Sequence, residues 1–382
     1  MSYGLTILKI DKDPLLHAFF QWQATGEEED FRQFLSRLYD NGAQDDFSSY
    51  VEEKILCDQN AFSIAAAQQK GVSPYLEKAY RQDLALVREK LVGAKTQDMF
   101  CIGEKLTEKA ESTDSIAALE AFYRRFGYGE FIRYRAFRFE DGNLRPVESP
   151  SLIQLSDLKN YESEKKTVAD NIENFLHGYP HSNMLLYGER GTGKSSTIHA
   201  MLNRYFDEGL RLVEISKENV LCVAALKERL KDVPLKFMIY IDDLSFSSGD
   251  ERISSLKAAL EGCSEGNTDN AMIVATSNRR HIIDESFSRR DDSVHAGDNM
   301  QKELSLSDRF GITVLFSTTN KEAYLSIVRQ MADDKKIDLS REQLELLAER
   351  WAIMKGGRSP RRARQFIDLV YSRMLSKTPI DF

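Results

Sequence analysis

The residues best suited to chemistry lie in the run NMLLYGERGTGKSST, residues 183–197. Within it, Gly188, Gly193, Lys194 and Ser195 follow the spacing G-x-x-x-x-G-K-S. Glycines at these positions let backbone N–H groups surround phosphate oxygens, the lysine supplies a positive charge, and the serine hydroxyl is a magnesium ligand. We therefore predict a phosphate-binding loop, whose contact residues are Gly188, Glu189, Arg190, Gly191, Thr192, Gly193, Lys194, Ser195 and Ser196.

The segments on either side of the loop are those that a phosphate-binding loop requires. Residues 184–187 form a short apolar run, typical of a buried parallel strand, and residues 195–206 have a helical pattern. The N-terminus of that helix would direct its positive dipole end at the same anion. An ordinary turn before a helix is the alternative, but the order of strand, loop and helix favours phosphate binding.

An acidic pair, Asp242 and Asp243, ends the apolar run of residues 236–241. A carboxylate at the C-terminal end of a parallel strand, beside the loop, can complete a magnesium shell or orient an attacking water. We assign Asp242, together with Ser195, to magnesium and Asp243 to the water. A strand-ending turn made by the aspartate side chains is the alternative.

A polar amide, Asn278, follows the apolar run of residues 271–275 after Thr276 and Ser277. At the end of a strand this amide can contact the terminal phosphate or help to hold the water. Capping of the next turn is the alternative role.

These strand ends belong to a longer alternation of strands and helices. The apolar runs that predict strands are residues 184–187, 210–215, 236–241, 271–275 and 312–316. Helical patterns separate them near residues 195–206, 217–231 and 251–261. Five strands that alternate with helices predict a three-layer α/β sandwich around a parallel five-stranded sheet.

The N-terminal part, residues 1–150, is predicted to be mainly helical. Apolar residues recur at helical spacings in residues 31–39, 74–91 and 116–126. Residues 132–144 alternate bulky and charged side chains and then turn at Asp141-Gly142, which indicates a strand entering a hairpin. Its arginine and aromatic residues could form a stacking surface for nucleic acid, but a strand with one solvated basic face is favoured. No catalytic pattern is visible here, so this part is better suited to selecting a partner.

The C-terminal part, residues 320–382, has the pattern of three amphipathic helices. They are predicted at residues 320–332, 340–354 and 359–375. Ser359 is suited to cap the last of them, with Pro360 at its first position. Arg361, Arg362 and Arg364 then lie in the first turn, where cations oppose the helix dipole. An anionic partner explains this placement better than a solvated basic turn.

The segment that joins the N-terminal part to the α/β part has two interpretations. PVESP, residues 146–150, contains two prolines and indicates a domain boundary. Leu155, Leu158 and Tyr161 then precede a helical pattern near residues 163–177. They could line an adenine pocket or belong to the core of a helical connection, and the residues by themselves favour neither.

Composition excludes several classes of protein. The chain has 382 residues, of which 42% are hydrophobic, enough for two or three globular domains. A formal charge of −8 argues against coating nucleic acid by bulk electrostatics. The four cysteines lack C-x-x-C spacing, so neither a zinc site nor a disulfide framework is indicated, and a reducing cytoplasm is expected. No window has the ~18 apolar residues of a membrane helix.

Together these features resemble the AAA+ ATPases over residues 151–376. They also look most like the bacterial family catalogued as domain of unknown function 815. The runs that carry this likeness are LLYGERGTGKSS, DDLSF, ATSNRRHII, LSLSDRFG and GGRSPRRARQFID. The resemblance implies an ATPase that binds ATP and Mg²⁺. It implies a nucleotide-binding core at residues 151–319 and a helical lid at 320–382, beside the helical N-terminal domain at 1–150 that the residue pattern predicts.

The resemblance also implies roles for single residues in the core. Lys194 and Ser195 match the P-loop pair, Asp242 the magnesium-associated acid, and Asn278 the first sensor. AAA+ enzymes usually carry glutamate where this chain has Asp243. Because aspartate is shorter by one methylene, a water polarised by it would sit differently, and hydrolysis is expected to be slow.

Further roles concern the base and the neighbouring subunit. Arg309 is similar in position to the arginine finger that reaches the ATP of a neighbouring subunit, which implies a homo-oligomer. Arg361 looks like the second sensor, with Arg364 one turn on as its substitute. Residues 155–161 resemble the segment that holds adenine, although Asn160 stands where a glycine is expected.

The leading hypothesis is an ATP hydrolase whose nucleotide state moves the helical lid and so remodels a protein partner held by the N-terminal domain. A switch or scaffold that binds ATP and hydrolyses it slowly is the first alternative. The second is a nucleic-acid-associated loader that uses Arg279, Arg280, Arg289 and Arg290. The net acidity of the chain weighs against the loader, and a small-molecule kinase would not need the S-D-R-F element or the three-helix tail.

Overall fold

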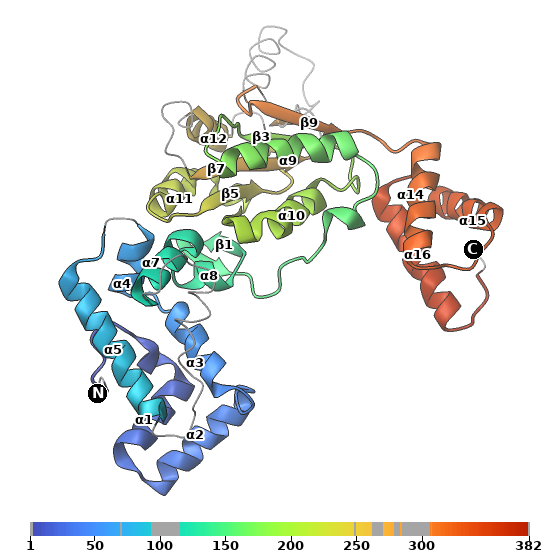
Figure 1. Cartoon of the computed structure of the whole chain (residues 1–382). Coiled ribbons are helices and arrows are strands. Elements are labelled where there is room, and N and C mark those ends of the chain that lie inside the picture. The colour runs from blue at the N-terminus through green and yellow to red at the C-terminus, as the bar shows by residue number, and fades with distance from the viewer. Residues whose placement is uncertain are drawn as a thin grey trace. The chain divides into compact units, whose positions relative to one another are not determined.

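A computed structural model describes the chain over residues 3–68, 71–92, 115–247, 250–261, 270–278, 283–284, 306 and 308–380 (Figure 1). The chain forms two compact units. The first comprises Met1–Arg135 with Lys231–Leu235, and the second comprises Ala136–Leu230 with Lys236–Phe382. Among the described residues, no helix has both the length and the apolar character needed to cross a membrane.

The first unit is helical, as predicted. Its elements are the 3-10 helix η1 (Ile10–Lys12) and the helices α1 (Pro14–Thr25), α2 (Glu28–Asp40), α3 (Phe47–Leu56), α4 (Ala61–Ala67), α5 (Pro74–Val92), α7 (Ser115–Phe126) and α8 (Glu130–Arg133). Asp13 caps α1 by accepting the backbone N–H groups of Leu15 and Leu16. Asn60 and Ser63 form a capping box at the start of α4. Local side chains thus satisfy backbone donors that these helix ends leave open.

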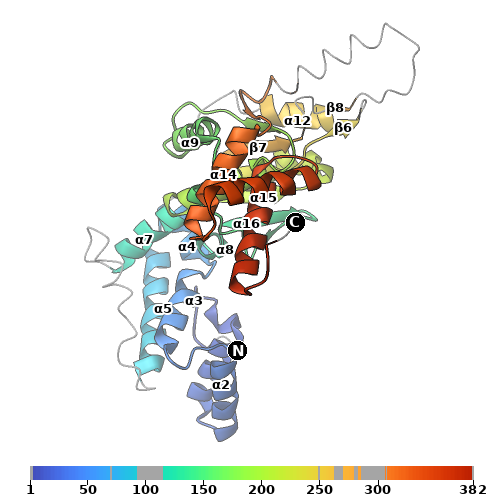
Figure 2. The same ribbon diagram turned by 90° about the vertical axis from the view of Figure 1, so that its right-hand side faces the viewer.

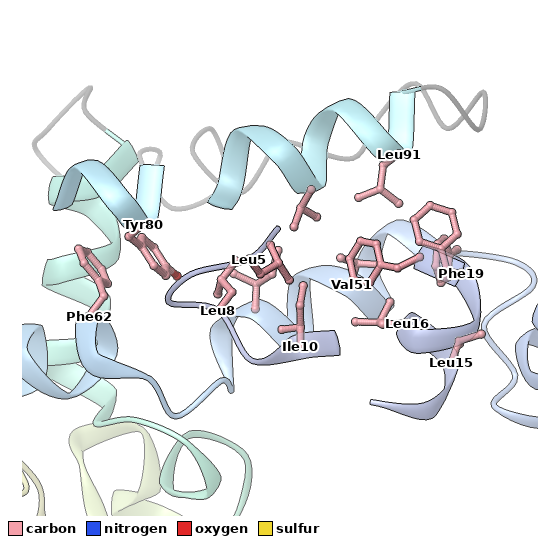
Figure 3. Close-up of a cluster of buried hydrophobic side chains, with 14 of the residues drawn as sticks. Leu5, Leu8, Ile10, Leu15, Leu16, Phe19, Val51, Phe62, Tyr80 and Leu91 are labelled. Carbon is pink, nitrogen blue, oxygen red and sulfur yellow. The ribbon is translucent and has the colours of Figure 1, made fainter. Parts of the chain in front are cut away.

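Aromatic and aliphatic side chains fill the core of this unit (Figure 3). The rings of Phe62 and Tyr80 stack in parallel with their centroids 4.0 Å apart. The buried carboxylate of Asp83 accepts the backbone N–H groups of Thr6, Ile7 and Leu8. Because a buried carboxylate needs such donors, this residue ties the N-terminal segment to α5.

The second unit is built on a mostly parallel sheet with the strand order β2-β1-β4-β5-β7-β3-β9. The strands are β1 (Ala136–Glu140), β2 (Asn143–Pro146), β3 (Met184–Gly188), β4 (Leu210–Ile215), β5 (Lys236–Ile241), β7 (Ala271–Ser277) and β9 (Ile312–Phe316). Two further short strands, β6 (Phe246–Ser247) and β8 (Ile283–Asp284), pair with each other. The predicted α/β fold is confirmed. The sheet has seven strands rather than five, because a hairpin extends it beyond β4.

The extra strands are the hairpin predicted near residues 132–144. Asp141 and Gly142 both have positive φ, 51° and 74°, which is the backbone of a two-residue hairpin turn. Strand β1 pairs in parallel with β4. Consequently the first compact unit ends at Arg135, whereas the sequence placed the domain boundary near residue 150.

The same hairpin contradicts the stacking interpretation of its aromatic residues. Phe137 and Phe139 are buried, with 1% and 4% of their surfaces exposed, so they belong to the core. Arg138 lies near the carboxylates of Glu140 and Glu214, at 3.7 Å and 3.6 Å. The strand therefore has the favoured pattern, with apolar side chains buried and charged side chains outside.

Helices cover both faces of the sheet (Figure 1). On one face lie α9 (Glu162–Leu176) and α10 (Lys194–Tyr205), whose apolar side chains pack on alternate residues of the strands. The opposite side chains, such as Phe237 and Ile273, are also buried. Helices α11 (Val223–Leu230) and α12 (Arg252–Glu261) belong to that layer. The helix predicted at residues 217–231 begins as a 3-10 helix, η4 (Lys217–Cys222).

Three C-terminal helices form a bundle with its own core (Figure 2). They are α14 (Lys321–Asp334), α15 (Arg341–Met354) and α16 (Pro360–Leu375). Each is preceded by a residue whose side chain accepts a backbone N–H of the first turn: Asn320, Ser340 and Ser359. The predicted start of α16, a serine cap followed by proline, is confirmed.

Candidate active site

A cavity of about 450 Å³ opens in the second unit, at the C-terminal edge of the sheet. Most of its lining comes from the glycine-rich loop, the ends of β5 and β7, residues 157–161 and the start of α16. The predicted site residues in its lining are Tyr161, Arg190, Gly191, Thr192, Gly193, Lys194, Ser195, Ser196, Asp242, Asp243, Asn278, Arg361 and Arg364. Its size is that of a small-molecule site, for which ~300–1,000 Å³ is typical.

Glycines shape the loop because other residues would not fit. Gly188 has φ 140°, and a Cβ atom there would lie 2.1 Å from the carbonyl oxygen of Phe316 on β9. Gly191 and Gly193 also have positive φ, 81° and 104°. The loop thus turns sharply between β3 and α10, as the motif predicts.

Lys194 is buried and folds back onto its own loop. Its ammonium group donates to the carbonyl oxygens of Gly188 and Glu189, at 2.7 Å and 2.8 Å, and lies 3.4 Å from the Oδ1 atom of Asn278. Burial lowers its pKa, an effect that the carboxylates of Asp243 and Asp242 oppose. The ammonium group is therefore held among oxygen acceptors at the N-terminus of α10, where an anion would be stabilised.

Ser195 and Asp242, the two predicted magnesium ligands, are in contact. The Ser195 hydroxyl donates to Oδ1 of Asp242 at 2.9 Å. Tyr240 and Thr276 donate to the same oxygen, at 2.7 Å and 2.5 Å. Although desolvation acts to raise it, the hydrogen bonds from Thr276, Tyr240 and Ser195 leave the pKa of Asp242 below its usual value. Asp242 is thus kept ionised, the state in which a carboxylate binds a cation.

Asp243 lies in the turn that follows β5, so the turn interpretation and the catalytic one apply to the same residue. Its φ is 49°, a left-handed conformation that aspartate tolerates better than most residues. The side-chain amide of Asn278 donates to its Oδ1 atom, and the guanidinium group of Arg190 lies 3.8 Å from its Oδ2 atom. The structure therefore brings the predicted water-orienting carboxylate and the predicted sensor amide into direct contact.

Residues 157–161 form the other end of the cavity. Asn160 and Tyr161 both have left-handed backbones, with φ of 71° and 62°. Asparagine adopts this conformation more readily than other non-glycine residues, so Asn160 can stand where glycine is expected. The Tyr161 hydroxyl donates to the carbonyl oxygen of Ser317 at 2.6 Å. Leu155, by contrast, packs against the core of the sheet and is not among the lining residues.

The start of α16 meets the loop and the 157–161 segment. The backbone N–H of Arg361 donates to the carbonyl oxygen of Gly191 at 3.2 Å. The Arg364 guanidinium donates to the carbonyl oxygen of Asp157 at 3.1 Å. Two arginines of the C-terminal bundle thus reach the cavity predicted to hold an anion.

Arg309 is placed apart from these residues. It is half-buried beside the fully buried Phe310, and it is not among the residues that line the cavity. The predicted residues Gly188 and Glu189 are likewise outside the lining, although their carbonyl oxygens contact Lys194. The arginines proposed for nucleic acid, Arg279, Arg280, Arg289 and Arg290, lie outside the described residues.

The residues present fit a nucleotide with a divalent cation. A Cβ atom at Gly191 would lie only 3.2 Å from the Arg361 side chain, so glycine at this position keeps the loop open towards α16. Hydroxyl and carboxylate oxygens, as in Ser195 and Asp242, are the ligands that Mg²⁺ prefers. Two helix N-termini, those of α10 and α16, border the cavity.

Among the lining or supporting residues that the sequence did not indicate are Tyr240, Thr276 and Lys165. Tyr240 carries a phenol two residues before Asp242. Its only sequence signal is that it is a polar group in an otherwise apolar strand. Thr276 was noted only as the end of a strand. Lys165 lines the cavity and donates to the carbonyl oxygen of Leu158 at 2.6 Å, a contact with no signature in the sequence.

Comparison with known proteins gives one family. The family model described as "Protein of unknown function (DUF815)" matches residues 132–374. A search of curated proteins finds no match.

Solved structures match at low similarity. The RuvB Holliday junction branch migration motor of Thermotoga maritima is 16% identical, with a TM-score of 0.41, over 59% of this chain and 67% of that one. The FIGL-1 AAA domain in complex with ADP is 18% identical, with a TM-score of 0.41, over 60% of this chain and 76% of that one. A katanin structure, titled for its self-assembly, is 14% identical, with a TM-score of 0.39, over 60% and 74%. Similarity this distant says nothing of a substrate or partner.

Proposed function

The chain belongs to the DUF815 family, and on that premise we propose that it is a magnesium-dependent ATPase of the AAA+ type. Its nucleotide state would move helices α14–α16 relative to the sheet and so change the conformation of a protein partner. The N-terminal unit is the part proposed to hold that partner. The proposal concerns the cavity at the sheet edge and the residues that line it.

One observation carries the proposal. Ser195 and Asp242 come from a helix and a strand that are 47 residues apart in the sequence, yet their oxygens meet at 2.9 Å. The buried ammonium group of Lys194 lies in the same cavity. A cation-binding oxygen pair beside a phosphate-binding lysine is what transfer of a phosphoryl group requires.

Each group of residues in the cavity has its own proposed role. Lys194 and the N–H groups of the loop would bind the phosphates, and Ser195 with Asp242 would hold Mg²⁺, which neutralises phosphate charge when bound. Asp243 and Asn278 would orient the attacking water, because their side chains already meet at the end of the sheet. Tyr161 and its neighbours would surround the base. Arg309 would reach the cavity of a neighbouring subunit.

Contacts between the bundle and the cavity support the proposed movement. Arg361 and Arg364 contact the loop and the base-side segment. Lys159 also forms an ion pair with Asp334 at the end of α14, at 2.7 Å. A ligand that changed the loop or the base-side segment would therefore act on α14 and α16 directly.

A slowly hydrolysing switch is the second candidate, and the surroundings of Asp243 favour it. Its carboxylate accepts the Asn278 amide and lies near Arg190. Each of its two oxygens thus already has a neighbouring donor, which leaves less room to accept a hydrogen bond from an attacking water. An enzyme with this arrangement would hold ATP for longer between turnovers.

ATP turnover per subunit, measured across a series of protein concentrations, tests the proposal. Lys194→Met should abolish nucleotide binding, whereas Lys166→Met, at an exposed position on α9, should not. Arg309→Ala should abolish turnover but leave binding intact, with Arg341→Ala as the surface control. Turnover that rises with concentration supports a shared site in an oligomer.

Other results of the same assays would exclude one or both functions. If ATP binds but turnover stays at background at every concentration, the motor is excluded. If Asp243→Glu then restores turnover, the switch is the better description. If neither ATP nor ADP binds the wild-type protein, both functions fail.

A further inference from the structure

Three hydroxyl groups converge on a single carboxylate oxygen. Oδ1 of Asp242 accepts the hydroxyls of Ser195, Tyr240 and Thr276 at 2.9, 2.7 and 2.5 Å. The phosphate-binding motif accounts for Ser195. It does not account for the other two, and neither was assigned a role in the site from the sequence.

The sheet explains why these groups meet. Successive side chains of a strand alternate between its faces, so Tyr240 shares a face of the sheet with Asp242, two residues further on. In the pairing of β5 with β7, Ile241 lies opposite Ala275. One residue further along each segment are Asp242 and Thr276, whose side chains form a hydrogen bond. One donor therefore comes from the same strand, one from the neighbouring strand, and Ser195 from the helix that covers this face.

Tyr240 is held in place by its own packing. Only 3% of its surface is exposed, and its ring lies edge-on to that of His199, with the centroids 5.9 Å apart. Its hydroxyl donates to Oδ1 of Asp242 at 2.7 Å, because a carboxylate oxygen can only accept.

Thr276 makes a second hydrogen bond in addition to the one with Asp242. Its hydroxyl oxygen accepts the backbone N–H of Asp243 at 3.0 Å while its hydrogen goes to Asp242. It is almost fully buried, with 1% of its surface exposed. Thr276 therefore fixes both the carboxylate of Asp242 and the turn that carries Asp243.

We propose that Tyr240 and Thr276 are positioning residues that set the orientation of the Asp242 carboxylate for a magnesium–nucleotide complex. The three hydroxyls engage Oδ1, so Oδ2 is the oxygen we expect to serve the hydration shell of the cation. Without the phenol, the carboxylate loses a fixed donor and can rotate. This inference rests on the proposed function, because it concerns the same cation.

Nucleotide binding with and without Mg²⁺ tests the inference separately from turnover. The dissociation constant of a fluorescent ATP analogue is measured in EDTA and in excess Mg²⁺, and the ratio of the two gives the contribution of the cation. Tyr240→Phe removes one hydrogen bond to a charged group, which corresponds to a loss of about tenfold in that ratio. The constant in EDTA should not change. Thr276→Val should act in the same direction, and Thr276→Ser should retain the wild-type ratio.

Tyr205→Phe is the matched control. Tyr205 is a buried tyrosine of the same core, and its hydroxyl donates to Glu173 rather than to the site. Its substitution should leave the Mg²⁺ ratio unchanged while costing similar thermal stability.

Two results would overturn the inference. One is an unchanged ratio in Tyr240→Phe. The other is an equal weakening in EDTA and in Mg²⁺, which would mean a packing defect. Failure of the proposed function looks different, since Mg²⁺ would then not tighten nucleotide binding in the wild-type protein.

Discussion

The backbone N–H of Arg361 donates to the carbonyl oxygen of Gly191 at 3.2 Å, which joins the first turn of α16 to the glycine-rich loop. The two residues are also packed closely. A Cβ atom at Gly191 would lie 3.2 Å from both the Cβ atom of Arg361 and the hydroxyl of Ser359. A shift of the loop would therefore be felt at the first turn of α16. This contact is a physical basis for the proposed coupling.

Gly191→Ala should weaken nucleotide binding by separating the loop from α16. The left-handed backbone at φ 81° costs an alanine ~1–2 kcal/mol, and its methyl group meets Arg361. Gly178→Ala imposes similar strain, at φ 72°, with no atom within 4 Å of the added Cβ. Both variants should lose thermal stability, but Gly191→Ala alone should bind the ATP analogue more weakly. Equal affinities in the two variants would contradict a role for the contact.

Asn160 should tolerate glycine but not a β-branched residue. Its φ of 71° suits asparagine and glycine, whereas valine there costs at least ~1–2 kcal/mol. We expect Asn160→Gly to bind nucleotide as the wild type does. Asn160→Val should lower the melting temperature and weaken binding, because Tyr161 follows directly. Calorimetric melting with and without nucleotide measures both effects, and a stable, fully binding valine variant would refute this account.

Asp243→Glu should be less stable than Asp243→Asn. The backbone at φ 49° is left-handed, and asparagine, like aspartate, adopts it more readily than glutamate. The expected difference in unfolding free energy is ~0.5–1 kcal/mol, of the order of the left-handed penalty. Thermal melts of both variants without nucleotide measure it. A glutamate variant as stable as the asparagine variant would show that the turn relaxes to another conformation.

Asp13 should make the stability of the first unit depend on pH. Although burial acts to raise it, the Lys54 ammonium, the Leu16 N–H and the Tyr50 hydroxyl leave the pKa of Asp13 below its usual value. A lowered pKa in the folded state stabilises the protein above the unfolded value of ~3.9, and this stabilisation is lost as the pH falls through the folded value. Asp13→Asn should therefore cost ~1–2 kcal/mol at pH 7, as expected for hydrogen bonds to a charged group, and this cost should shrink as the pH falls below ~3.9 and through the folded-state pKa of Asp13.

Urea unfolding followed by the fluorescence of Trp22 measures this difference, because Trp22 lies on α1, the helix that Asp13 caps. A Trp351→Phe background removes the other tryptophan, which is in α15. Asp40→Asn deletes the same charge at an exposed position and is the matched control. A constant difference between wild type and Asp13→Asn from pH 7 to 3 would contradict the argument.

Local patterns in the sequence predicted the elements closely. The strands at residues 210–215, 236–241 and 312–316 have the predicted bounds, because long apolar runs between polar turns leave little choice of register. Serine and asparagine caps set the starts of the three C-terminal helices. The hairpin was also expected, but its place in the sheet was not. The local sequence of a hairpin does not indicate which strand of the sheet it will pair with.

By itself, the sequence determined the loop, the strand ends and the chemical types of Lys194, Ser195 and Asp242, since each follows from the spacing of neighbouring residues. Only the tertiary structure decided that Tyr240 and Thr276 share an oxygen of Asp242, and that Arg361 meets Gly191. The reason is physical. Hydrogen bonds act over about 3 Å, and the distances between residues far apart in the chain are set by strand order, register and helix docking, which depend on the packing of the whole unit.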